Sequence, residues 1–244
     1  MYNPKGNGEL KKAKQVQFIE MKPPKFLMGI VHRFSEIKTN VPLDEEYLHH
    51  ALPDACTYLI FDQLDVKIAG VTNLYTISEE LNLGKEFHYV WVRFLPGVWK
   101  GQVKYGLVNL PYTGILPLKE TNYQLACLDF TAKQAVLIRL IEQLIKEKIV
   151  VANPIAEKLA SHIDIIHTVE DMADIVGVSS RQLQRILKNS VGFKPHDFLK
   201  ILHLQQSIGD DGYSLYYTDQ SHFIRSFRKA TGYSPMRYTK KFDV

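Results

Sequence analysis

Up to about residue 118, the chain alternates short apolar runs with segments rich in Pro, Gly, Asn and Asp. The runs are QVQFIEM, FLMGIVHRF, CTYLIF, VKIAGV and HYVWVRFL. Runs of this length bounded by turn residues predict β-strands. Because successive side chains of a strand point to opposite faces, Phe87, Tyr89, Trp91 and Arg93 share one face of the last run. We expect that face to look into a core or a cavity of a β-rich, barrel-like domain.

From Thr131 the apolar period becomes helical. One stripe holds Leu137, Leu140, Ile141, Leu144 and Ile145. The pattern predicts a helix that links two halves, with its stripe either packed on its own domain or forming a dimer seam. Pro154 interrupts the helical pattern at a plausible boundary. We expect an α+β chain with a β-rich regulatory domain at 1–130, a linker helix and connection at 131–160, and an all-α domain at 161–241.

The C-terminal part repeats itself at an offset of 40 residues. The matched pairs are Leu183 with Phe223, Arg185 with Arg225, Leu187 with Phe227, Lys188 with Arg228, Gly192 with Gly232, Phe193 with Tyr233, Pro195 with Pro235, and Phe198 with Tyr238. Apolar, basic, glycine and proline positions all keep register, which indicates two copies of one supersecondary unit. Two copies suggest that the chain makes two equivalent contacts with its binding partner.

The first copy has the signals of two short helices joined by a tight turn. Thr168 is suited to cap the first helix with Asp171 at its third position, and Gly177 can end it in the left-handed conformation. Ser179 or Ser180 can then cap a second helix. A turn of about three residues forces the helices to cross, as in a helix-turn-helix unit.

The second helix of this copy separates apolar from polar side chains. Its inward positions are Leu183, Ile186 and Leu187, and its outward ones include Ser180, Arg181, Gln182, Gln184, Arg185 and Lys188. Arg can make two parallel hydrogen bonds to a guanine edge and Gln can do so to adenine, whereas Lys suits phosphate. The pattern predicts a helix that enters a major groove.

The second copy follows the same logic. It offers Thr218 as a cap and Phe223 and Phe227 as inward positions. Its candidate outward groups are Gln220, Ser221, His222, Arg225, Arg228 and Lys229. Between the copies, Pro195 can open a rigid connector helix that fixes the distance between the two recognition helices.

The net charge of +4 is modest for a protein that binds nucleic acid, but its distribution is uneven. Residues 161–180 hold four acids and no Lys or Arg, whereas 181–204 hold five cations and one acid. Residues 225–241 hold six cations and no acid. Two segments are therefore suited to meet a phosphate backbone.

These residues resemble the AraC/XylS family of bacterial transcription regulators. The resemblance rests on VEDMADIVGVSSRQLQRILKNSVGFKP (169–195) and YTDQSHFIRSFRKATGYSPMRY (217–238) and covers about 80 of 244 residues. It implies a seven-helix domain whose two helix-turn-helix units, joined by a long helix, contact successive major-groove segments. The family's base-contacting positions fall on Arg181, Gln182, Gln184, Arg185, Asp219, Gln220, Ser221 and Arg225.

The resemblance has a weaker extension and one departure. The segments LPDACTYLIF and WVRFLPGVW look like the small β-rich domain found ahead of such DNA-binding regions in one branch of the family. The departure is GDDGYSL, a poor helix at the place where the first helix of the second unit is expected. Binding by the second unit is therefore less well supported than binding by the first.

Other chemistry is sparse. Two cysteines without a CxxC pair suggest neither disulfides nor zinc and fit a reducing cytoplasm. The pair His49-His50 points to opposite strand faces and, with His88, lacks carboxylates at ligand spacing, so we expect no metal. The polar, lysine-rich N-terminus and the interrupted apolar stretches predict neither a secretory signal nor a membrane span.

The β-rich half offers one candidate ligand site and one alternative function. Tyr89, Trp91, Arg93 and Trp99 are candidates to line an effector pocket, although aromatic residues in small β domains are more often packing. Because phosphate loops, GxSxG and HExxH motifs are absent from the sequence, we expect no catalytic residue, no cofactor and no enzyme. A buried cluster of titratable residues around His88 would favour the alternative of a β-barrel enzyme fused to DNA-binding helices.

The sequence thus predicts a cytoplasmic, sequence-specific DNA-binding transcription regulator. Its expected partner is double-stranded DNA, and RNA polymerase, a small-molecule effector and a second copy of the chain are further partners compatible with that role. A third hypothesis is a regulator that acts mainly through protein contacts. The family's DNA-repair branch is disfavoured because the cysteine cluster it needs is missing.

Overall fold

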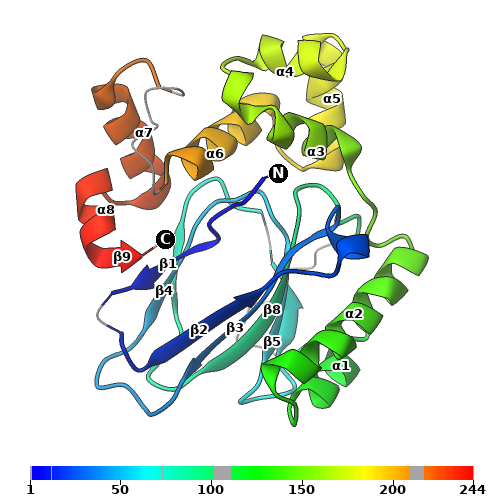
Figure 1. Cartoon of the computed structure of the whole chain (residues 1–244), viewed down its shortest axis with the longest axis vertical. Coiled ribbons are helices and arrows are strands. Elements are labelled where there is room, and N and C mark those ends of the chain that lie inside the picture. The colour runs from blue at the N-terminus through cyan, green and yellow to red at the C-terminus, as the bar shows by residue number, and fades with distance from the viewer. Residues whose placement is uncertain (1, 12, 73, 102–110, 209–216, 244) are drawn as a thin grey trace.

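The computed structural model describes residues 2–11, 13–72, 74–101, 111–208 and 217–243. It is mixed α/β, with its sheets in the N-terminal half and most of its helices in the C-terminal half (Figure 1). The strands are β1 (Asn7–Leu10), β2 (Val16–Met21), β3 (Val31–Thr39), β4 (Leu48–Ala51), β5 (Tyr58–Asp62), β6 (Ala69–Val71), β7 (Glu79–Asn82), β8 (His88–Phe94) and β9 (Phe242–Asp243).

The helices follow the sheets along the chain. They are α1 (Leu118–Leu125), α2 (Phe130–Lys146), α3 (Pro154–Ser161), α4 (Val169–Val176), α5 (Ser180–Ser190), α6 (Pro195–Ser207), α7 (Gln220–Thr231) and α8 (Pro235–Lys241), with short 3-10 turns at Lys25–Leu27 and Ile163–Ile165. In Figure 1, α4 and α5 lie at one side above the sheets, α7 and α8 lie at the other, and α6 runs between them.

Two antiparallel sheets form the N-terminal half. One has the order β2-β3-β8-β5-β6 and the other the order β7-β4-β1-β9. The sheets are not closed into a barrel, so the barrel-like part of the fold prediction is wrong. The apolar runs correctly predicted most strands of the five-stranded sheet. Whether a sheet closes into a barrel depends on pairing between strands that are distant in sequence, and hydrophobic periodicity does not report such pairing.

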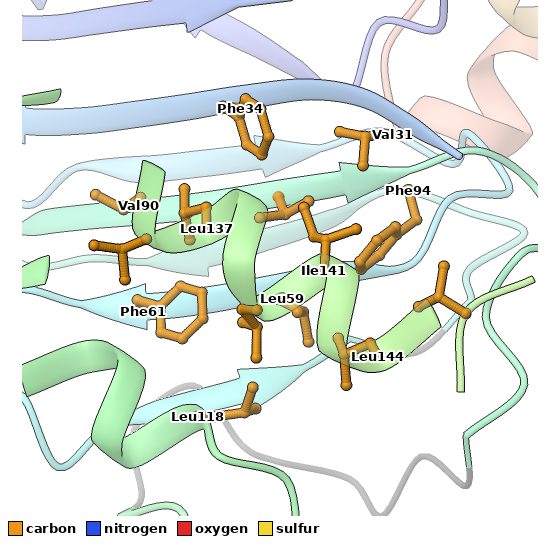
Figure 2. Close-up of a cluster of buried hydrophobic side chains, with 14 of the residues drawn as sticks. Val31, Phe34, Leu59, Phe61, Val90, Phe94, Leu118, Leu137, Ile141 and Leu144 are labelled. Carbon is orange, nitrogen blue, oxygen red and sulfur yellow. The ribbon is translucent and has the colours of Figure 1, made fainter. Parts of the chain in front are cut away.

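The central strand β8 divides its side chains between two cores, as its alternation predicts. Val90, Val92 and Phe94 are fully buried and face α2 and its neighbours (Figure 2). Trp91 lies in a different buried cluster with Phe87, on the side of the second sheet. The strand therefore carries a helix on one face and an inter-sheet space on the other.

The apolar stripe of α2 packs on the five-stranded sheet. Leu137, Ile141 and Leu144 are fully buried beside Leu59 and Phe94 (Figure 2). Burial of such side chains contributes about 1.5–3 kcal/mol each relative to exposure. The stripe is thus covered by the sheet of the same chain and does not present a dimer seam.

The helical half has two cores of its own. The first gathers α3 to α6 and includes the side chain of Tyr2 from the N-terminal segment. The second gathers α7, α8 and β9 and includes Leu52, next to β4. Both ends of the chain therefore lie where the sheets meet the helices (Figure 1).

Candidate nucleic-acid interface

Helices α4 and α5, called here the first helix pair, have the local structure that their sequence predicts. Thr168 and Asp171 form a capping box, with the Thr168 N–H donating to Asp171 Oδ2 at 2.8 Å and the Asp171 N–H donating to Thr168 Oγ1 at 3.1 Å. Gly177 ends α4 with φ 81°. These signals are local in sequence, which is why pattern and structure agree.

The cap of α5 is Ser179 rather than Ser180. The Gln182 N–H donates to Ser179 Oγ at 3.3 Å, and Gln182 Oε1 accepts from the Ser179 N–H at 2.9 Å. The Gln182 side-chain oxygen is thereby committed to the helix end. Of the predicted base-contacting residues on α5, Gln182 is the one with a structural task of its own.

The two faces of α5 differ sharply. Leu183 and Leu187 are fully buried, and Ile186 is half-buried. The predicted contact residues are all exposed: Ser180, Arg181, Gln182, Gln184, Arg185 and Lys188. In the described part of the chain, no ion pair engages the three cations of this face. The face can therefore bind an anionic, hydrogen-bonding surface without first breaking internal salt bridges.

Helix α6 connects the two copies and begins at Pro195, as predicted. Phe198 and Leu202 are fully buried against the first helix pair. Near its other end, Gln205 Oε1 accepts from the Lys5 N–H at 2.6 Å, and Gln205 Nε2 donates to the Pro53 carbonyl oxygen at 2.8 Å. The connector is thus tied to the N-terminal half as well as to the first helix pair.

The cap of α7 is Asp219, so the prediction of Thr218 is wrong. The His222 N–H donates to Asp219 Oδ1 at 2.7 Å. A carboxylate suits this position because it also compensates the positive end of the helix dipole. Asp219 is exposed, but its carboxylate is engaged by the helix end and not held free for a base.

The remaining predicted residues of the second copy are exposed on α7, and its apolar ones are buried. The exposed residues are Gln220, Ser221, His222, Arg225, Arg228 and Lys229. Phe223 and Phe227 are buried, with ring centroids 5.5 Å apart. The poor helix predicted at GDDGYSL lies outside the described residues.

Helices α7 and α8 with β9, called here the C-terminal unit, dock on the four-stranded sheet. Strand β9 pairs with β1 through Glu9 opposite Asp243 and Leu10 opposite Phe242. In addition, the Ser78 N–H donates to the Ala230 carbonyl oxygen at 2.7 Å. This docking could not be predicted from the sequence, since a two-residue strand leaves no periodic signal.

His50 is at the centre of the docking contact. Its Nε2 lies 3.1 Å from the Thr231 carbonyl oxygen and its Nδ1 lies 3.3 Å from Tyr238 Oη. Its ring stacks on Phe242 with a centroid distance of 4.9 Å. Burial lowers the pKa of His50, opposed by the hydrogen bond to Thr231. The neutral ring therefore suits this site at neutral pH.

The four predicted pocket residues have different surroundings. Tyr89 and Trp91 line a cavity of about 100 Å³ between the two sheets. Arg93 is buried behind that cavity, where its guanidinium donates to the Pro4 carbonyl oxygen at 2.8 Å and to Glu20 Oε1 at 3.1 Å. Trp99 is elsewhere, because the turn at Gly97 (φ 70°) takes the chain out of the strand and the Trp99 ring packs on Phe94.

A second buried polar cluster lies under α2. Glu36 Oε1 accepts from Lys133 Nζ at 2.7 Å and lies 2.9 Å from His88 Nε2. Burial alone would raise the pKa of Glu36, but the hydrogen bonds to His88 and Lys133 outweigh it and lower the pKa to about 2. This is a titratable cluster around His88, the feature that would favour the enzyme hypothesis.

Metal and membrane features can be stated for the described residues only. No three or more His, Cys, Asp or Glu side chains gather there in a way that could hold a metal ion. No helix in the same part of the chain is long and apolar enough to cross a membrane. Comparison of the sequence with known protein families gives no match, and comparison with curated proteins gives none either.

Proposed function

We propose that the chain is a sequence-specific DNA-binding transcription regulator and that α5 is its principal recognition helix. The observation that carries the proposal is the exposed face of α5, whose cations have no ion-pair partner in the described part of the chain. This face stands on a capped helix pair joined by a short turn. The sequence resemblance to AraC/XylS regulators supports the same function.

Four side chains on this face have separate roles in the proposal. Gln184 and Arg185 contact base edges, because the amide of Gln offers one donor and one acceptor to adenine and the guanidinium of Arg offers two donors to guanine in the major groove. Lys188 contacts phosphate and contributes affinity without sequence preference. Gln182 mainly holds the helix end, since its side-chain oxygen accepts from Ser179.

The C-terminal unit is the second DNA contact in this proposal. Gln220, Ser221 and Arg225 are its base-contacting candidates, and Arg228 and Lys229 are its phosphate contacts. Because the unit is docked on β1 and β4, its position depends on the N-terminal half. A molecule bound between the sheets can therefore act as an effector, and RNA polymerase and a second copy of the chain are further proposed partners.

The test is the salt dependence of binding to DNA. We expect the affinity for a promoter fragment to fall steeply with salt, because phosphate contacts release counterions. Lys188→Ala should reduce the slope by about one ion. The matched control is Lys146→Ala, an exposed lysine near the end of α2. A slope that is flat for the unmodified protein would contradict direct DNA binding.

Two observations favour alternative functions. The Glu36, His88 and Lys133 cluster favours an enzyme in the N-terminal half, although all three side chains are already hydrogen-bonded beneath α2. The docking of the C-terminal unit favours a regulator that acts through protein contacts. Either alternative gains support if the salt experiment shows no DNA binding.

A further inference from the structure

The space between the two sheets has the composition of a small-molecule site. It is a cavity of about 100 Å³, and its lining includes Ile37 and Ile60 from one sheet and Leu81 and His49 from the other. An apolar lining with a few polar groups is typical of ligand sites in proteins. An apolar cavity of roughly 150 Å³ can hold benzene. The cavity between the sheets is smaller, so the part of a ligand that fits inside it can be no larger than a benzene ring.

Two residues of the lining each have a buried nitrogen atom that lacks a hydrogen-bond partner in the described part of the chain. Trp91 is 6% exposed, and its Nε1 has no hydrogen-bond partner among the described residues. The same holds for Nδ1 of His49, whose ring lies 6.0 Å from that of Trp91. Buried donors in native proteins almost always have an acceptor. The Trp91 indole can only donate, so it requires an acceptor.

The charges near the cavity are already balanced. Asp54 accepts from Tyr58 Oη at 2.5 Å and from the Cys56 N–H at 2.9 Å, and its carboxylate lies 3.9 Å from Arg93 Nε. Among the described residues, the lining contains no Lys or Arg. An anionic ligand would lose its hydration there without gaining an opposite charge, and the Asp54 carboxylate that a cation would meet is already paired with Arg93.

We propose that this cavity binds a small, uncharged, largely apolar molecule whose carbonyl or ether oxygen accepts a hydrogen bond from the Trp91 indole. The proposal names the class of effector for the regulator described above, and in that role it rests on the proposed DNA-binding function. The position of the site also suggests how a bound molecule could affect the C-terminal unit. His49 lines the cavity, and the next residue of β4, His50, contacts Thr231 of the C-terminal unit.

The test uses three probes with equal numbers of non-hydrogen atoms: cyclopentanone, methylcyclopentane and butyrate. The chain has two tryptophans, so its two indole N–H resonances can be followed separately in the intact protein. We expect cyclopentanone to shift the Trp91 resonance and leave that of Trp99 unchanged. Its Kd should be about tenfold lower than that of methylcyclopentane, since the ketone alone satisfies the buried donor. Butyrate should not bind.

Two variants make the result specific. Trp91→Phe keeps an aromatic ring but removes the donor, so saturation-transfer experiments on the probes should show that the preference for the ketone is lost. The control Trp99→Phe should retain it. Equal binding of ketone and hydrocarbon to the unmodified protein, preference for butyrate, or binding of no probe would each overturn the proposal. None of these measurements involves DNA, so a failure here leaves the DNA-binding proposal to its own test.

Discussion

The first helix pair and the C-terminal unit carry similar sequence but are held in different ways. The first helix pair packs with α3 and α6 in one helical core and has a capping box at the start of both its helices. The C-terminal unit shares its core with Leu52 and Leu204, and its last strand pairs with β1. One copy is supported within the helical half, and the other depends on the sheet beside it.

Two copies of one motif can therefore have separate tasks. A recognition helix supported mainly by other helices, with Tyr2 as one contact from the N-terminal half, should keep its geometry when the docking contact of the C-terminal unit changes. A helix that is docked through His50 and β1 changes its position when that contact changes. The predictions below test this contrast between a fixed first helix pair and a dependent C-terminal unit.

The largest expected effect is on the core of the first helix pair. Leu183 is fully buried on the inner face of α5, so Leu183→Ala should lower the free energy of unfolding by about 2–5 kcal/mol. Urea unfolding measures the change. The control Ile224→Ala removes a residue on α7 that is 39% exposed and should cost much less. Equal losses of unfolding free energy in the two variants would contradict the assignment of Leu183 to the core and of Ile224 to the surface.

The next effect concerns the two arginines at equivalent positions. Arg185→Ala should reduce the discrimination at one base pair by about 1–3 kcal/mol. Arg225→Ala should have a smaller effect, because its helix is docked on the sheet. Binding to matched and single-substituted DNA fragments measures both. Arg139→Ala, an exposed arginine on α2, serves as the control. A larger effect at Arg225 would reverse the proposed order of the two helices.

A smaller effect separates the two candidate caps of α7. Asp219→Ala should lower the free energy of unfolding by about 1 kcal/mol, because the His222 N–H loses its acceptor. Thr218→Ala should have almost no effect, because Asp219 provides the cap. Thermal or urea unfolding of both variants gives the comparison. A loss of stability in Thr218→Ala with none in Asp219→Ala would assign the cap to Thr218, the residue predicted from the sequence.

The smallest effect is the response of the docking contact to pH. Burial lowers the pKa of His50 below its usual 6.5, so the neutral ring stabilises the docked state fully above about pH 6.5. That stabilisation is lost as the pH falls from 6.5 toward the lower pKa. Hydrogen exchange at the Lys11 amide, which donates to the Lys241 carbonyl oxygen, should therefore speed up in this range relative to amides of α5.

The pH response needs a variant control, because other charged groups lie near His50. Glu80 and Lys241 lie beside His50, and burial also lowers the pKa of His203 in α6. His50→Asn should remove the difference between the Lys11 amide and α5 without removing the response of His203. An unchanged pH response in this variant would assign it to another group.

What the sequence predicted well is local in the chain. Thr168 and Gly177 are capping signals that act within a few residues, and the alternation along β8 correctly separated Trp91 from Val92. What it missed is non-local. The pairing of β9 with β1 joins residues from the two ends of the chain, and no period in either segment reports it.

The candidate sites show the same division. The exposed face of α5 follows from helical spacing, so the outward residues that the sequence predicted are all exposed. The cavity was only half predicted, because Tyr89 and Trp91 share a strand whereas Asp54 and His49 come from other segments. A charged residue within the apolar run LPDACTYLIF was the one local signal that marked Asp54.

The most direct test of the account is selection of bound fragments from a random pool of double-stranded DNA. The unmodified protein should enrich one sequence motif, and the double variant Gln184→Ala, Arg185→Ala should lose preference at the positions that α5 contacts. Arg139→Ala should enrich the same motif as the unmodified protein. An identical motif from the double variant, or no enriched motif from the unmodified protein, would contradict the assignment of α5 as the recognition helix.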